Sequence, residues 1–172
     1  TARAESDYFS RKYDVTYTVK EDGKTAVVLT VTLTNKTSEY YASTDTITVG
    51  FDDIQDVKAR DNSTELKSVV TRTKEGNAIE IPFNQKVVGK DKALTFVVTF
   101  DTTNVAHHKG KTWEINIPGI SSPDDFSDFK AEVKVPESFG RPSYIKPVQK
   151  DNILIFTKEE LGKSGISIAY GA

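Results

Sequence analysis

The chain contains no cysteine and no methionine, and it has only two histidines and one tryptophan. The absence of cysteine excludes disulfide bonds, thiolate metal ligands and a cysteine nucleophile. No apolar run approaches the roughly 18 to 20 residues that a membrane-spanning helix needs, so we expect no membrane insertion by this segment. Because methionine is missing even at position 1, we expect the chain to be a piece cut from a longer protein.

The charged residues, 28% of the chain, are of both signs and interspersed, and the net charge is −2. This balance gives no electrostatic basis for binding nucleic acid or an anionic membrane surface, so no nucleic-acid partner is predicted. With 37% hydrophobic residues in 172 positions, the chain can bury at least one core.

The dominant pattern is alternation of apolar and polar residues. After a turn at residues 89–92, Leu94, Phe96, Val98 and Phe100 alternate with Thr, Val and Asp. A period of two residues is typical of a β-strand with one face on a core. We therefore predict an all-β fold, a two-sheet antiparallel β-sandwich of about eleven short strands with almost no helix. The expected strands are residues 13–19, 27–33, 44–51, 54–60, 66–74, 78–83, 94–101, 112–117, 129–135, 153–156 and 166–172.

The predicted domain organisation is simple. Residues 1–10 show no period and are interpreted as a loose lead-in, and residues 11–172 as one β-sandwich domain. A division into two stacked halves near residues 100–112 stays open. Residues 104–110 are predicted to form a loop or a single helical turn, and residues 137–151 a long loop.

Two local features allow sharper predictions. A three-residue loop at residues 21–23 would pair Tyr17 with Val27 and place both apolar rows on one core, with Gly23 in the left-handed conformation. Thr157 and Glu160 have the spacing of a capping box, which predicts a single helical turn after Thr157.

The only histidines, His107 and His108, are adjacent. Neighbouring residues of a strand point to opposite faces, so this pair does not fit one metal ion on a regular strand. No Gly-x-Ser-x-Gly motif accompanies them. We interpret them as two solvated loop histidines, and we predict no catalytic residue and no cofactor.

Two groups of aspartates are candidate calcium ligands. Asp52, Asp53 and Asp56 form the first group, and Asp124, Asp125 and Asp128 form the second. Loop carboxylates can hold Ca²⁺ between strands, but neither group matches a helix-loop-helix calcium motif. Solvated turns are the alternative that we favour.

Aromatic residues suggest a second kind of site. Tyr40 and Tyr41 lie in a predicted loop, where they could stack on a sugar, whereas Trp113 shares a face with Ile115 and Ile117 and is interpreted as core. Tyr40 and Tyr41 are therefore the candidate ligand-binding residues.

Four stretches together resemble a known protein class: residues 31–61, 79–102, 110–120 and 133–147. The order of strands, Gly89 before the long strand and the later Val133-x-Val135-Pro136 are similar to the amino-terminal β-sandwich region of bacterial extracytoplasmic transglutaminase-like proteins. They are also similar to the lumenal part of ribophorin I and, more distantly, to the amino-terminal β-domain of zinc aminopeptidases. The Cys, His and Asp of the transglutaminase-like site cannot be mapped onto this chain.

The resemblance implies a non-catalytic accessory module of a larger cell-envelope protein, outside the cytoplasm. Its implied partner is a downstream domain of the same polypeptide. The alternatives are a module that binds glycan or cell-wall polymer, or another envelope protein, and a structural adhesin-type domain with an internal isopeptide bond.

Overall fold

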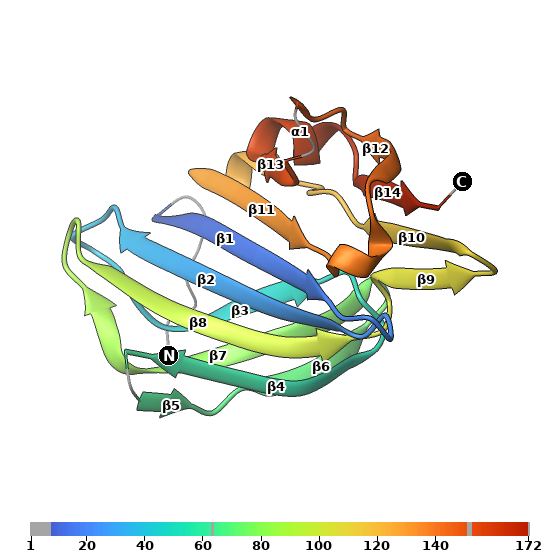
Figure 1. Ribbon diagram of the computed structural model, residues 1–172. Coiled ribbons are helices and arrows are strands. Elements are labelled where there is room, and N and C mark those ends of the chain that lie inside the picture. Colours follow the sequence, from blue (N-terminus) through green and yellow to red (C-terminus); the bar gives the residue numbers. More distant parts are fainter. Residues whose placement is uncertain (1–7, 63, 151–152, 172) are drawn as a thin grey trace.

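The computed structural model describes residues 8–62, 64–150 and 153–171. The all-β prediction is confirmed, since 62% of these residues lie in strands and 8% in helices. They form three sheets rather than the expected two (Figure 1). The additional sheet arises because short strands late in the chain build a unit of their own.

The largest sheet has seven strands in the order β13-β11-β1-β2-β8-β4-β5. Neighbours are antiparallel except for β1 and β11, which are parallel. The strands are β1 (Phe9–Val19), β2 (Thr25–Asn35), β4 (Ile54–Asp61), β5 (Thr64–Leu66), β8 (Ala93–Thr102), β11 (Asp128–Lys134) and β13 (Ile155–Thr157).

The two smaller sheets are antiparallel throughout. One has the order β3-β7-β6, with β3 (Tyr41–Val49), β6 (Val69–Thr73) and β7 (Gly76–Val88). The other has the order β12-β14-β10-β9, with β9 (Ala106–Lys109), β10 (Thr112–Ile117), β12 (Pro142–Lys146) and β14 (Ile166–Tyr170). Two 3-10 turns, η1 (Pro123–Asp125) and η2 (Glu137–Phe139), and the helix α1 (Lys158–Lys163) complete the fold.

One main core lies between the seven-stranded sheet and the two smaller sheets. Alternate residues of β1, β2 and β8 point into it, as the period-2 pattern predicted, and meet isoleucines of β3, β7, β10 and β14. The most deeply buried members include Val31, Ile47, Ile79, Ile81, Phe96, Val98, Ile115, Phe156, Ile166 and Ile168. A smaller cluster of Phe9, Leu33, Ala42 and Val87 closes one end.

The predicted turn between β1 and β2 is confirmed. Tyr17 pairs with Val27, and the amide of Gly23 donates to the carbonyl of Lys20 at 2.9 Å. Gly23 has φ +92°, the left-handed region that glycine occupies at little cost. A β-carbon there would also lie 2.9 Å from the Trp113 ring, so both backbone and packing require glycine at this position.

Several predicted boundaries were wrong. Residues 106–109 form strand β9 rather than a loop or helical turn, and β12 lies inside the range 137–151 that was predicted as a loop. The single strand expected at 66–74 is replaced by β5 and β6, which belong to different sheets. Each of these strands is short and mostly exposed, so it shows little alternation.

The domain prediction stays largely untested. Residues 1–7 of the expected lead-in lie outside the described residues, and β1 already begins at Phe9, whose side chain is buried. The described strands β11 and β13, from late in the chain, join the same sheet as β1. A division into stacked halves near residues 100–112 remains a prediction.

The predicted capping box is present at the start of α1. The Thr157 hydroxyl accepts from the Glu160 amide at 3.3 Å, and the Thr157 amide donates to the Glu160 carboxylate at 3.0 Å. The carbonyl of Leu161 in α1 accepts from the amide of Ile120 at 2.9 Å. The short helix therefore fixes the segment 118–122, which forms one wall of the cavity described below.

Replacing Thr157 by alanine removes the cap and should lower the free energy of unfolding by about 1 kcal/mol. Thr157→Ser keeps the hydroxyl and is the matched control, with an expected loss well below that value. Urea denaturation followed by circular dichroism measures both. Equal losses in the two variants would show that the hydroxyl does not stabilise the helix.

Candidate functional site

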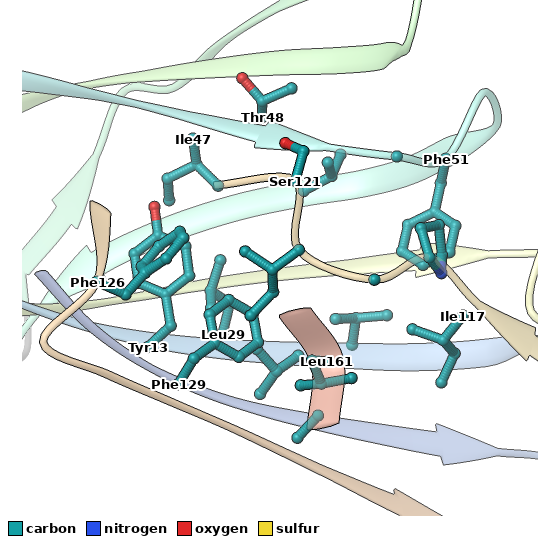
Figure 2. A pocket seen from close by; sticks show the side chains of 18 of the residues that line it. Tyr13, Leu29, Ile47, Thr48, Phe51, Ile117, Ser121, Phe126, Phe129 and Leu161 are labelled. Atoms are coloured by element: carbon teal, nitrogen blue, oxygen red, sulfur yellow. The ribbon is translucent and has the colours of Figure 1, made fainter. Parts of the chain in front are cut away.

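A cavity of about 600 Å³ lies between the inner face of β1 and β2, strand β3 and the segment 118–122 (Figure 2). A volume of this size is in the range of small-ligand pockets, roughly 300 to 1,000 Å³. Several of its lining residues are exposed, including Glu75, Ser121, Ser122 and Asp125, and they mark where it meets solvent. The site is therefore a partly open pocket and not a sealed void.

Apolar side chains from both sheets form the interior of the cavity. Leu29 and Ile47 face it from β2 and β3, and Phe126, Phe129 and Leu161 enclose it from the late part of the chain (Figure 2). Phe126 and Phe129 pack edge to face at 5.1 Å. This lining suits an apolar ligand group.

A buried ion pair lies at one end of the cavity. Arg11 of β1 donates from Nη2 to Oδ1 of Asp45 in β3 at 2.8 Å, and Nε lies 3.4 Å from Oδ2. The Asp45 side chain is 0% exposed. Burial lowers the pKa of Arg11, but the hydrogen bond and charge of Asp45 raise it more, so the net shift is upward. Because Arg11 lies in β1 and Asp45 in β3, the pair ties the two sheets together.

Two tyrosines of β1 place hydroxyl groups among the apolar side chains of the lining. Tyr13 and Tyr17 are less than one-tenth exposed, and neither hydroxyl makes a hydrogen bond to another described residue. Every fully buried side-chain oxygen or nitrogen in the described part has a partner, so these two hydroxyls retain some accessible surface. Figure 2 shows the Tyr13 hydroxyl directed toward β3.

The same burial defines the charge state of the tyrosines. Desolvation raises the pKa of both phenols, and for Tyr13 the charge of Asp45 adds to the increase while Arg11 opposes it. Both are therefore neutral near pH 7 and can donate hydrogen bonds. A ligand with an oxygen acceptor beside an apolar group would match this arrangement.

The aspartate groups predicted as calcium ligands are dispersed among other contacts. Asp52 pairs with Arg72 at 3.3 Å, and Asp53 accepts from the Thr103 hydroxyl at 2.7 Å. Asp56 sits in an irregularity of β4 with φ +53°. Within the described ranges, no cluster of three or more His, Cys, Asp or Glu side chains is arranged to hold a metal.

The second aspartate group lies near the cavity. Asp124 and Asp125 are in η1, and Asp128 begins β11. Asp125 alone of the three lines the cavity, at its exposed margin. Calcium binding at either group remains a prediction.

The tyrosines predicted as a sugar platform are separate from the cavity. Tyr40 is 49% exposed, and its ring packs on Tyr8 at 4.5 Å. Tyr41 is the first residue of β3 rather than a loop residue, and the Lys86 ammonium lies 4.9 Å from its ring centroid. Glycan binding by Tyr40 and Tyr41 remains a prediction.

The two histidines are exposed, as predicted, but lie on strand β9. The His108 ring stacks on Trp113 at 4.5 Å, and Trp113 stacks on Phe139 at 4.8 Å. Trp113 is thus packed between neighbours and is only partly buried. Neither histidine lines the cavity.

Sequence reasoning missed the cavity. Its apolar residues were identified only as one face of a core. Their alternation predicts burial but does not reveal whether the side chains of the facing sheet fill the space between the sheets. The available signal was the polar groups in the inward row of β1, where Arg11, Tyr13 and Tyr17 alternate with the outward residues, since a buried phenol normally needs a polar partner.

Solved structures with the same fold are M1 zinc metallopeptidases and related enzymes. Leukotriene A4 hydrolase from Saccharomyces cerevisiae matches with a TM-score of 0.57 and 14% identity over 95% of this chain and 29% of that chain. An M1 zinc metallopeptidase from Deinococcus radiodurans matches with a TM-score of 0.55 and 13% identity over 95% of this chain and 42% of that chain. The chain thus spans less than half of these proteins, and the likeness shows the fold alone.

These matches correct the family expectation. The resemblance to transglutaminase-like proteins and to ribophorin I is wrong, because the matching structures are M1 peptidase N-terminal domains and the family model that matches, given below, is a different one. The more distant resemblance to zinc aminopeptidases agrees with them in fold. The shared pattern of strands and turns was too general to separate these sandwich-like domains.

No curated protein matches the chain. Among the described residues, none of the helices has the length and apolar character to cross a membrane. The model of one family, described as "Predicted membrane protein (DUF2207) N-terminal domain", matches residues 10–167. The chain therefore belongs to the DUF2207 N-terminal domain family.

Proposed function

We propose that this chain is a non-catalytic accessory domain of a larger membrane protein, outside the cytoplasm, and that it binds an apolar ligand group in the cavity beside β3. The family description supports a larger membrane protein, because it describes the matched region as the N-terminal domain of a predicted membrane protein. A downstream part of the same polypeptide is the proposed intramolecular partner.

The observation that carries the proposal is the composition of the cavity lining. Leu29, Ile47 and Phe129 supply apolar surface, while the hydroxyls of Tyr13 and Tyr17 are left without a partner among the described residues. The described residues of the lining include no histidine, cysteine or lysine. Such a pocket is suited to binding and orienting a ligand rather than to proton transfer or nucleophilic attack.

Ligand binding can be tested with N-phenyl-1-naphthylamine, a neutral apolar fluorophore. We expect saturable binding to the wild-type domain, seen as increased fluorescence. Ser121 is exposed at the margin of the cavity, so Ser121→Trp should place a ring across it and weaken binding at least tenfold.

The matched control is Ser138→Trp, because Ser138 is also exposed but does not line the cavity. This variant should bind the fluorophore like the wild type. The proposal fails if the fluorophore does not saturate the wild-type domain, or if both tryptophan variants bind it equally.

A further inference from the structure

The part of the β3 edge at Thr46 and Thr48 adds a second kind of recognition to the cavity. β3 lies at one end of the order β3-β7-β6, so β7 is its single partner among the described strands. Its other side faces the cavity, whose lining includes Thr46 and Thr48 from this strand. An unpaired strand edge is a template for another strand.

The register shows which backbone groups occupy that edge. Thr44 pairs with Pro82, and proline has no amide hydrogen, so this pair cannot exchange both ladder hydrogen bonds. In an antiparallel ladder, hydrogen-bonded residue pairs alternate with non-hydrogen-bonded pairs. With Thr44 and Pro82 as a non-hydrogen-bonded pair, Thr46 and Thr48 occupy non-hydrogen-bonded positions opposite β7 as well. Their amides and carbonyls therefore point away from β7.

These backbone groups have no partner elsewhere in the described part of the chain. No hydrogen bond from the segment 118–122 reaches Thr46 or Thr48. Because Ile47 and Val49 are the buried residues of this part of β3, the side chains of Thr46 and Thr48 lie on the opposite face. Figure 2 shows the Thr48 side chain directed away from the cavity, so its contribution to the lining is backbone.

Charge at the cavity margin favours a basic partner. Asp125 lies near Arg11 at one end, and Glu75 lies at the other end, beside the turn that joins β6 to β7. Arg11 is already paired with Asp45. The exposed charged residues that line the cavity are therefore acidic.

We propose that the cavity takes an extended peptide segment of a partner protein, which adds to β3 as a further strand. Thr46 and Thr48 bond to its backbone, its inward side chains are apolar and enter the cavity, and lysine or arginine lies at each end of the segment. This inference rests on the proposed function, because it names the ligand class of the same cavity.

A peptide fits these features better than another apolar ligand does. Two residues at the edge offer alternating donors and acceptors, and only another extended backbone presents the complementary row at the same spacing. An acyl chain would fill the apolar interior but would leave the edge groups unpaired, which costs free energy when they are removed from water.

The test uses the whole domain and an immobilised array of heptapeptides. Each peptide has lysine at both ends and threonine at alternate internal positions. The remaining positions carry every combination of Val, Ile, Leu, Phe and Tyr. A second array has the same sequences with N-methylated amides, which cannot donate to a strand edge.

Thr46→Pro removes the edge amide and places a ring in its position, while the bonds from β3 to β7 are retained because they use the other residues of the strand. Thr46→Val keeps the amide and is the matched control. We expect several unmodified peptides to bind the wild-type and Thr46→Val domains, with binding to Thr46→Pro at least tenfold weaker. N-methylation should weaken binding similarly.

Equal binding to Thr46→Pro and Thr46→Val, or equal binding of methylated peptides, would overturn the strand addition. If no peptide binds but the fluorophore still does, strand addition is wrong and the proposed apolar binding stands. If the fluorophore does not bind either, both proposals fail. A circular dichroism spectrum of Thr46→Pro that matches the wild type shows that the loss is not caused by unfolding.

Discussion

Replacing Asp45 by alanine should lower the free energy of unfolding by about 3–5 kcal/mol. The carboxylate is 0% exposed and receives the Arg11 guanidinium at 2.8 Å. Removing it takes away the carboxylate that accepts from a cation whose side chain is only 10% exposed, and loss of one member of a buried ion pair is strongly destabilising. Urea denaturation followed by tyrosine and tryptophan fluorescence measures the loss.

Two comparisons make this prediction specific. The double variant Arg11→Met, Asp45→Leu should recover most of the stability, because apolar residues of similar size often replace a buried ion pair at little cost. Asp14 pairs with Lys130 at 3.5 Å, and both side chains are about half exposed, so Asp14→Ala should cost under about 1 kcal/mol. If Asp45→Ala costs no more than Asp14→Ala, the buried pair does not hold the sheets together.

Replacing Phe96 by alanine should have an effect of similar size, about 3–5 kcal/mol. The Phe96 ring is 0% exposed, and its centroid lies 5.5 Å from that of Phe83, so it spans the gap between the seven-stranded and three-stranded sheets. Truncation removes apolar contacts and leaves a void that packed strands cannot close. The midpoint of urea unfolding should fall accordingly.

The neighbouring residue provides the control. Thr95 is exposed on the outer face of β8, where its hydroxyl lies 3.3 Å from that of Thr32. Thr95→Ala should cost less than about 1 kcal/mol, because it loses one exposed hydrogen bond and some strand propensity. If Phe96→Ala and Thr95→Ala lower the free energy of unfolding by similar amounts, the assignment of Phe96 to the inner face of β8 is wrong.

Much of the fold could be predicted where the physics is local. Phe96, Val98 and Phe100 alternate over a long strand, and burial of one face follows from that period. The position of Gly23 followed because a shift of one residue would have turned one apolar row to solvent. The cap at Thr157 depends on a spacing within one turn of helix.

The remaining features depend on distant partners. β9 contains His107 and His108 and becomes a strand only because β10 pairs with it. The cavity forms because β3 ends its sheet opposite the segment 118–122, and neither sheet order nor that approach leaves a local pattern in the sequence. The order of the strands in the sheets and the position of the cavity could therefore not be predicted from the sequence.

The parallel pairing of β1 with β11 has a consequence for the order of folding. Lys12 pairs with Asp128 and Thr18 with Lys134, so one side of β1 stays open until the chain has been made through residue 134. Loop closure over this distance carries a large entropic cost before any contact is gained. During synthesis the growing chain would therefore expose this edge of its largest sheet, and a chaperone or a neighbouring nascent chain would meet β1 before β11 does.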